Sequence, residues 1–374
     1  MCMEAGHEKH ITIKDIARKA GCSTGTVDRV LHKRGRVSPE VRERIEEIIQ
    51  ELNYTPNVNA SLLAGRRKLR IGILLPAYEP GEYWELPKLG MDEAVNSYND
   101  QGYEVELHRL IHHSSKEYLK FGRQMITEGL DGVILSPAAF KDSIKLVRSY
   151  YQNNLPFILI DSNIEGLPSL SFIGKDPVQS GQTVAGLTHQ VTRHIPGKKL
   201  IWIINLSRKL SQMYALLTRE IGFMGYFSDR HLEESYRIQT FDIEDPAAPQ
   251  VLNEQMKELL AQGTPHAVYV TGSRVHKIAS ALHSILGESR PLILGHDLIQ
   301  GNIQGILEER IDFIIEEEAR QQGYLAVETL IRSILNKEKV EKKQLMKLMI
   351  YTRENLPVEL SGEKAAAERE KGVS

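Results

Sequence analysis

Polar and aromatic side chains stand at or just after the ends of five short apolar runs in the larger, second part of the sequence. Aromatic rings stack on the apolar face of a pyranose, and carboxylates bind its hydroxyl groups. An aspartate at a strand end can instead cap the next helix, but together these side chains indicate a site for a sugar-like molecule. The candidates are Tyr78, Glu79, Ser136, Asp161, Ser162, Thr271 and Asp297, with Tyr83 and Trp84 at the start of the following helical segment.

The apolar runs that carry these side chains alternate with amphipathic segments of helical period. Continuous apolar strands separated by helices are typical of a parallel sheet covered on both faces. A ligand of such a sheet lies outside the carboxyl ends of the strands. About ten strands are too many for one small sheet, so the prediction is an α/β fold with two doubly wound lobes that follow a small all-α head. The runs are 70–76, 105–110, 132–137, 157–161, 171–174, 200–204, 237–241, 267–271 and 292–297.

The head consists of three short helical segments. The first has an apolar stripe from Ile13 to Ala20 and ends at Gly21, and Ser23 is the expected N-cap of the second. A third begins at Ser38, which is followed by a proline. Two short helices joined by a tight turn form a helix-turn-helix, whose second helix enters the major groove of DNA. Three helices of this size could also form a module that binds a protein.

The start of the second helix offers small polar side chains and one arginine. Thr24, Gly25, Thr26 and Asp28 occupy its first turns, and Arg29 is suited to a bidentate contact with a guanine edge. Residues 1–70 contain 14 Lys and Arg against 9 Asp and Glu, a net of +5, whereas the rest of the chain contains 33 against 40, a net of −7. A basic head on an acidic body favours a polyanionic partner.

Four stretches of the head, TIKDIA at 12–17, GCSTGTVDRVL at 21–31, RVS at 36–38 and LNYTPN at 52–57, closely resemble the LacI/GalR family of bacterial repressors. Family members usually have a serine that touches phosphate where this sequence has Asp28. Because DNA phosphates repel an acid, we expect Asp28 to orient Arg29 or to accept a hydrogen bond from a cytosine amino group. The resemblance implies DNA contacts by Thr12, Ser23, Thr24, Gly25, Thr26, Arg29, His32, Arg36, Tyr54, Asn57, Ala60 and Leu63.

Residues 57–65 resemble the hinge helix of this family, which orders on operator binding. The resemblance implies that Leu63 from each of two chains wedges into a central base step of the minor groove and bends the DNA. Without the family, Leu63 would be an ordinary apolar residue of a short linker helix.

The stretches RIGILLP at 70–76, DGVI at 131–134, PFILID at 156–161, REIGF at 219–223 and GHD at 295–297 resemble the type I periplasmic-binding-protein fold that this family joins to its head. The resemblance implies that Arg219 and Asp297 contact the effector. Glu317 replaces a glutamine that many relatives have, and Thr271 stands near the place of an asparagine. The expected effector-binding residues are Glu79, Tyr83, Trp84, Ser136, Asp161, Ser162, Arg219, Thr271, Asp297 and Glu317.

These patterns predict four regions. A helix-turn-helix domain covers 1–56, a hinge helix and linker 57–69, an effector-binding domain 70–360 and a disordered tail 361–374. Within the effector-binding domain, the predicted N-lobe takes residues 70–165 and 300–335, and the C-lobe takes 166–299 and 336–358.

The expected protein is a cytoplasmic homodimer that binds a pseudo-palindromic operator under the control of a small molecule, a sugar first of all. Residues 1–10 lack the apolar segment of a signal peptide, and no stretch approaches the roughly 20 apolar residues of a membrane span. The sequence has no Gly-x-Gly-x-x-Gly after the first strand, no Walker lysine and no nucleophile elbow. We therefore expect that the protein is not an enzyme and that it binds no metal ion or cofactor. A purine or a partner protein as effector, and a solute-binding module without a regulatory role, remain the alternatives.

Overall fold

The structure, a computed structural model, describes residues 13–31, 37–52, 68–137, 140–166, 168–207, 214–246, 248–357 and 360. The chain divides into a small N-terminal unit and a large unit that begins at Lys68. The predicted hinge helix and C-terminal tail lie outside the described residues. No helix within the described ranges is both long and apolar enough to cross a membrane.

The small unit contains α1 (Ile13–Ala20), α2 (Thr24–Leu31) and α3 (Pro39–Glu51). Gly21 ends α1 with a backbone φ of +64°, a conformation that favours glycine at the end of a helix. The Ser23 hydroxyl accepts a hydrogen bond from the Thr26 amide at 3.2 Å, which confirms Ser23 as the cap of α2. Ser38 precedes α3 as expected, but its side chain makes no capping hydrogen bond. The three helices bury a common core of Ile16, Ala17, Ala20, Val27, Val30, Ile45 and Ile48.

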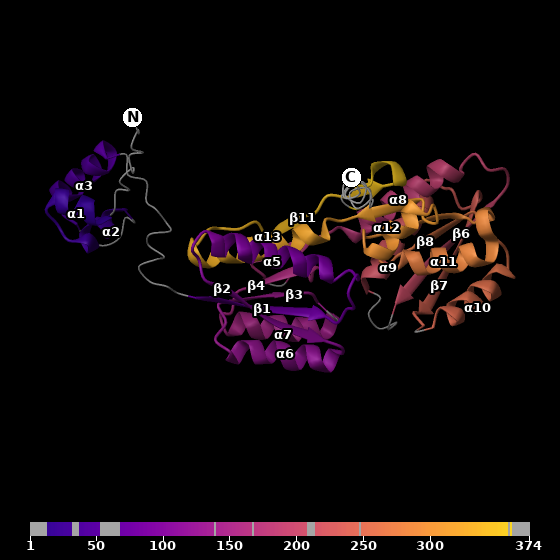
Figure 1. The fold of residues 1–374 in the computed structure, drawn as a ribbon, viewed down its shortest axis with the longest axis horizontal. Coiled ribbons are helices and arrows are strands. Elements are labelled where there is room, and N and C mark those ends of the chain that lie inside the picture. The colour runs from indigo at the N-terminus through magenta and orange to yellow at the C-terminus, as the bar shows by residue number, and fades with distance from the viewer. Residues whose placement is uncertain are drawn as a thin grey trace, which may run out of the picture. The chain divides into compact units, whose positions relative to one another are not determined.

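The first lobe of the large unit is built on a six-stranded sheet in the order β11-β5-β4-β3-β1-β2. Helices α5 and α13 cover one face of this sheet, and α6 and α7 cover the other (Figure 1). The strands are β1 (Leu69–Pro76), β2 (Val105–His112), β3 (Gly132–Leu135), β4 (Phe157–Asp161), β5 (Ser171–Gly174) and β11 (Lys343–Leu345). The helices are α5 (Glu85–Asp100), α6 (Ser115–Thr127), α7 (Phe140–Gln152) and α13 (Ala319–Leu335).

The second lobe repeats this design with a six-stranded sheet in the order β12-β10-β9-β8-β6-β7. Its strands are β6 (Lys199–Ser207), β7 (Tyr236–Glu244), β8 (Ala267–Val270), β9 (Leu292–His296), β10 (Phe313–Glu316) and β12 (Met349–Tyr351). Its helices are α8 (Pro177–Thr192), α9 (Tyr214–Ser228), α10 (Pro249–Leu260), α11 (Val275–Leu286) and α12 (Gln300–Leu307), with short 3₁₀ turns at Gly287–Ser289 and Arg353–Asn355.

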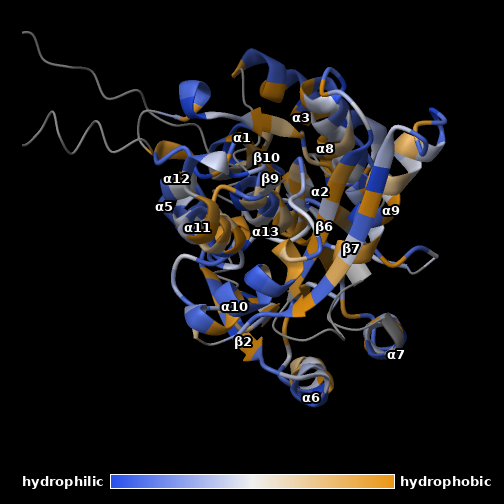
Figure 2. Cartoon of the chain, turned by 90° about the vertical axis from the view of Figure 1, so that its right-hand side faces the viewer, coloured by the Kyte–Doolittle hydropathy of each residue, from blue (hydrophilic) through white to orange (hydrophobic). Residues whose placement is uncertain are grey.

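Alternate side chains of the second sheet enter two separate apolar cores. Helices α8 and α9 pack on the face that contains Ile203 and Tyr269, and α10, α11 and α12 pack on the face that contains Trp202 and Val268. The edge strand β7 alternates polar and apolar residues along its length (Figure 2). The inner strands of the second sheet are buried on both faces, which explains why they are continuous apolar runs in the sequence.

The chain passes between the lobes three times. The first crossover, residues 175–176, joins β5 to α8, the second, residues 317–318, joins β10 to α13, and the third, residues 346–348, joins β11 to β12.

Parts of the predicted lobe division are wrong. The strand β5 pairs with β4 and so lies in the first lobe, although the sequence analysis places residues from 166 on in the second. Conversely, β10 pairs with β9 and α12 packs on α11, so both lie in the second lobe rather than the first. The strand β11 pairs with β5 in the first lobe, although the sequence analysis places residues from 336 on in the second. Sheet membership depends on pairing between distant segments, which local periodicity does not specify.

Candidate functional site

In the small unit, α2 presents one polar face to solvent. Thr24, Gly25 and Arg29 are exposed, whereas Val27 and Val30 on the opposite side are buried. Ser23 is exposed and Thr26 half-buried, and their hydroxyls lie 2.9 Å apart. The other residues predicted to contact DNA, Thr12, His32, Arg36, Tyr54, Asn57, Ala60 and Leu63, lie outside the described residues.

In the large unit, a cluster of charged side chains is buried at the carboxyl ends of the strands. We call Asp161, Lys175, Arg219, Asp297 and Glu317 the polar cluster. Asp161 ends β4, Lys175 follows β5, Asp297 follows β9 and Glu317 follows β10, whereas Arg219 comes from α9. Asp161 and Asp297 have backbone φ values of 66° and 70°, a left-handed conformation that is uncommon in non-glycine residues and is found at functional sites.

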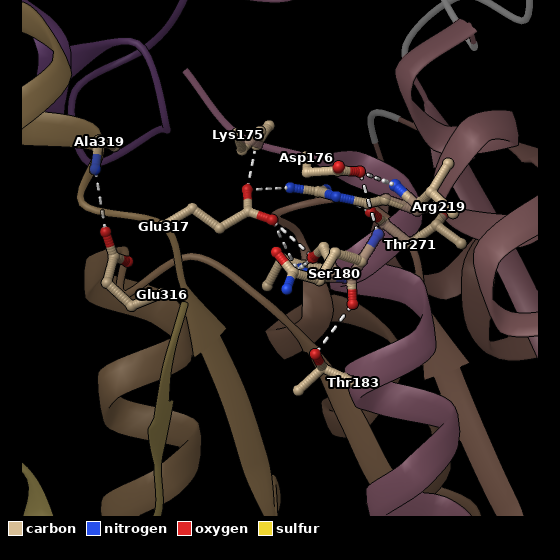
Figure 3. Close-up of polar contacts among 12 residues, drawn as sticks. Lys175, Asp176, Ser180, Thr183, Arg219, Thr271, Glu316, Glu317 and Ala319 are labelled. Atoms are coloured by element: carbon tan, nitrogen blue, oxygen red, sulfur yellow. Dashed lines mark hydrogen bonds and ion pairs between the residues drawn. The ribbon is translucent and has the colours of Figure 1, made fainter. Parts of the chain in front are cut away.

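Glu317 stands at the centre of the polar cluster and has an exposed fraction of 0%. Its Oε2 atom lies 2.6 Å from Arg219 Nη2 and 2.8 Å from Lys175 Nζ. Its Oε1 accepts a hydrogen bond from the Ser180 hydroxyl of α8 at 2.6 Å. Figure 3 shows this carboxylate extending from the second crossover toward Arg219, Lys175 and Ser180. The Glu317 carboxylate, on the second crossover, thus binds one side chain of the first crossover, one of α8 and one of α9.

Lys175 connects this centre to the first lobe. Its ammonium lies 3.0 Å from Asp161 Oδ1 and 4.9 Å from the centre of the Tyr83 ring. The Tyr83 hydroxyl donates a hydrogen bond to Asp161 at 2.8 Å, and the Ser162 hydroxyl donates another at 3.0 Å. The first lobe therefore contributes one carboxylate whose oxygens already have donors.

Arg219 is held on α9 by an unusually close approach of two helices. A Cβ atom on Gly181 of α8 would lie 1.9 Å from the carbonyl oxygen of Arg219, so only glycine fits at this position. The Arg219 side chain donates through Nη1 to the carbonyl of Thr271 at 2.5 Å, and the Thr271 hydroxyl bonds Asn205 at 2.6 Å. Main-chain and side-chain contacts therefore fix the guanidinium between α9 and the end of β8.

The charges of the polar cluster follow from these contacts. Burial opposes ionisation of Glu317, but Arg219 and Lys175 outweigh it and hold the pKa of that carboxyl well below its usual range. Burial likewise opposes the charge of Lys175 and Arg219, yet the neighbouring carboxylates raise the pKa of both side chains. Burial raises the pKa of Asp297 to about 7, against the attraction of Lys175 and Arg219.

A neutral histidine borders the cluster. Burial lowers the pKa of His296 well below its usual value, so the imidazole is uncharged and its 3.8 Å approach to Glu317 is no ion pair. The ring lies 3.3 Å from the Ser180 hydroxyl and 2.8 Å from the Tyr269 hydroxyl. Both ring nitrogens thus have partners that fix its orientation.

Two polar atoms of the cluster are buried without a hydrogen-bond partner among the described residues, Asp297 Oδ1 and Arg219 Nε. Each residue has an exposed fraction of only 2%. Buried polar groups in folded proteins nearly always have a partner. One acceptor and one donor therefore remain for a ligand.

Residues 12–57 match the family described as bacterial regulatory proteins, lacI family, and residues 71–338 match the periplasmic binding protein domain. The chain belongs to the periplasmic binding protein domain family, and its N-terminal unit matches the lacI family. The second match covers most of the chain and contains the whole polar cluster.

Proteins similar to this chain include named regulators. It is 30% identical over 176 residues to the HTH-type transcriptional regulator MalR of Streptococcus pneumoniae, and this match spans 46% of this chain and 51% of MalR, about half of either protein. It is 26% identical over 349 residues to the ribose operon repressor of Lactococcus lactis, covering 89% of this chain and 94% of the repressor. A solved structure from Bacteroides fragilis, described as a LacI transcriptional regulator, has a TM-score of 0.68 at 23% identity and covers 77% of this chain and 98% of its own. At this identity, the similarity to the solved structure shows a shared fold.

Hydrogen bonds and ion pairs connect six of the ten residues predicted for the effector site: Tyr83, Asp161, Ser162, Arg219, Thr271 and Glu317. A seventh, Asp297, lies near enough for the charges of Lys175 and Arg219 to lower its pKa against the effect of burial. The other three form no hydrogen bond or ion pair with the polar cluster among the described residues. Trp84 packs edge-on against Tyr83 with ring centres 5.0 Å apart, Ser136 is buried after β3, and the Glu79 amide donates to Glu82 at 2.9 Å.

Sequence reasoning missed Lys175, Ser180 and His296. A signal existed for the first, because Lys175 directly follows the predicted strand 171–174 just as Asp161 ends the strand before it. A lysine at a strand end is usually exposed, however, and its burial here follows from the three-dimensional pairing with two carboxylates.

Proposed function

We propose that this chain is a repressor-type transcriptional regulator whose affinity for operator DNA is controlled by a sugar bound at the polar cluster. Both family matches and the named regulators among its relatives support a DNA-binding head joined to a sensing domain. The name of the ribose operon repressor supports a sugar as the class of effector. A binding role in the cytoplasm, rather than a catalytic one, agrees with these relatives.

For the head, we propose that α2 lies in the major groove. Its exposed Thr24, Gly25 and Arg29 face away from the core, so they are available to base edges. Arginine makes bidentate contacts with guanine. The proposed regulator is a homodimer on a pseudo-palindromic site, because two-fold symmetry of the protein imposes it on the DNA. In this proposal Leu63 of each hinge helix bends the DNA.

The observation that carries the proposal is that two members of the polar cluster, Lys175 and Glu317, lie on the crossovers between the lobes. Lys175 belongs to the first crossover and pairs with Glu317 of the second at 2.8 Å. The next residue, Glu318, accepts a hydrogen bond from the Lys347 amide of the third crossover at 2.9 Å. A ligand on Arg219 would therefore contact a side chain that is paired with Glu317, on a segment that joins the lobes.

Effector binding changes DNA affinity only if the effector prefers one arrangement of the lobes. In this proposal a contact with Arg219, the partner of Glu317 on the second crossover, provides this preference. Coupling between two sites typically amounts to about 1–3 kcal/mol. We propose that the sugar is an inducer, which favours the arrangement released from DNA.

The test is operator binding by fluorescence anisotropy, with a DNA site found by in vitro selection and a panel of neutral monosaccharides. We expect a pseudo-palindromic site and one sugar that lowers its affinity. Arg219→Lys keeps the charge beside Glu317 but loses the planar fork of donors, so it should abolish the sugar response and spare DNA binding. Arg230→Lys, an exposed arginine near the same helix, is the control. Loss of DNA binding in Arg219→Lys would contradict the proposed division of roles.

A further inference from the structure

Both cations of the polar cluster have carboxylate partners within it. Lys175 has two carboxylate partners, Asp161 at 3.0 Å and Glu317 at 2.8 Å, and Arg219 has Glu317 at 2.6 Å. The cluster contains three carboxylates and two cations, and the exposed fractions of the paired side chains run from 0% to 12%. An anionic ligand would therefore compete with Asp161 or Glu317 for either cation.

The unpaired atoms, by contrast, suit a neutral ligand. Asp297 Oδ1 is an acceptor and Arg219 Nε is a donor, and both are buried. A hydroxyl group both donates and accepts, so a polyol can satisfy both atoms without adding charge.

An anionic ligand meets an energetic obstacle at the same place. Its phosphate or carboxylate would lie near Asp297 and Glu317 and would have to displace Glu317 or Asp161 from a cation. A buried charge that loses its partner is strongly destabilising. The polar cluster therefore discriminates between ligands by their charge as well as by the pattern of their hydroxyl groups.

We propose that the polar cluster binds an uncharged sugar or polyol and rejects phosphorylated and acidic sugars, and that Glu317 determines this specificity because it occupies both cations. This inference deepens the proposed function and rests on it. It names a residue whose removal should admit a new class of ligand.

The experiment is isothermal titration of the full chain with matched pairs, D-ribose and D-ribose 5-phosphate, D-galactose and D-galacturonate, and with inorganic phosphate as the smallest anion. The wild type should bind a neutral member at least tenfold more tightly than its charged counterpart. Glu317→Gln leaves Arg219 without its carboxylate partner and Lys175 with one fewer, so affinity for the charged members and phosphate should rise at least tenfold. Glu318→Gln is the matched control, because its side chain accepts from the Lys347 amide instead.

Two further variants separate charge from structure. Asp161→Asn removes the other partner of Lys175 and should also raise phosphate affinity, which keeps the test available if circular dichroism shows that Glu317→Gln is unfolded. The double variant Lys175→Met with Glu317→Gln removes one of the two cations that Glu317→Gln exposes, so it should bind phosphate more weakly than Glu317→Gln does.

Distinct results decide the two proposals. Tighter binding of charged members by the wild type, or no gain of phosphate binding in the folded variants over Glu318→Gln, overturns the role of Glu317. If no neutral sugar binds the wild type but Glu317→Gln gains phosphate binding, the charge selection stands and the sugar effector of the proposed function is wrong.

Discussion

Glu82 and Arg274 form an ion pair that joins the two lobes, with Arg274 Nη2 2.9 Å from Glu82 Oε1. Glu82 precedes α5 of the first lobe and Arg274 precedes α11 of the second. Asp245, on the second lobe, lies 3.4 Å from Arg274 and also pairs with Lys277. The arrangement of the lobes seen here thus contains a contact that would be lost if the lobes moved apart.

Arg274→Gln should weaken effector binding about two- to fivefold, because a partly exposed ion pair contributes up to about 1 kcal/mol. The variant removes a contact that favours the joined lobes and leaves the polar cluster intact. Arg320→Gln is a matched control, since its partner Glu93 lies in the same lobe. Titration of the effector into both variants checks the prediction, and equal losses in the two would argue against a link between the lobes.

Gly181→Ala should destabilise the second lobe by about 1–3 kcal/mol, as overpacking of a tight contact does. The new Cβ would lie 1.9 Å from the Arg219 carbonyl oxygen, so α8 and α9 must separate. Arg219 would then shift away from Glu317, and effector affinity should fall as well.

Gly225→Ala provides the comparison for this variant, because a Cβ there meets nothing within 4 Å. Alanine is favoured over glycine inside a helix by about 0.5–1 kcal/mol. Urea unfolding of both variants measures the difference, and a stable Gly181→Ala protein would contradict the backbone contact.

The sequence predicted the parts of the fold that depend on local pattern. All nine apolar runs are strands, and Ser23 caps α2 as expected. The short strands β10, β11 and β12 did not stand out. Which strands pair with one another could not be predicted from local pattern. The lobe to which β5 and β10 belong, for example, depends on their pairing with β4 and β9.

The candidate site divides in the same way. Arg219 and Glu317 are expected from a resemblance alone, whereas Asp297 is expected also from its position after a strand. The structure places the three near one another. That Glu317 binds two cations could not be foreseen, because Lys175 comes to it from a segment more than a hundred residues earlier in the chain.

Asp297→Asn should stabilise the protein increasingly as the pH rises from about 4 to about 7. Burial raises the pKa of Asp297 from 3.8 to about 7 in the folded state. The unfolded chain therefore loses this proton at lower pH than the folded chain, and ionisation costs stability across that interval. Asparagine has the same shape and does not ionise.

The measurement is urea unfolding of Asp297→Asn and wild type at several pH values from 4 to 8. Subtracting the two free energies of unfolding cancels the groups that both proteins share. The difference should grow up to about pH 7 and stay constant above it. A difference that does not change with pH would show that Asp297 ionises as easily in the fold as outside it.

Arg29→Ala should lower affinity for the selected operator about 10- to 100-fold, because a bidentate contact with a base contributes about 1–3 kcal/mol. Arg29 is exposed on α2 while Val30 beside it is buried, so its removal leaves the core intact. Arg44→Ala, an exposed arginine on α3, is the control and should change operator affinity little. Anisotropy at one fixed salt concentration compares both variants on the operator and on a scrambled duplex. An equal loss on the two duplexes would place Arg29 on phosphate instead of a base.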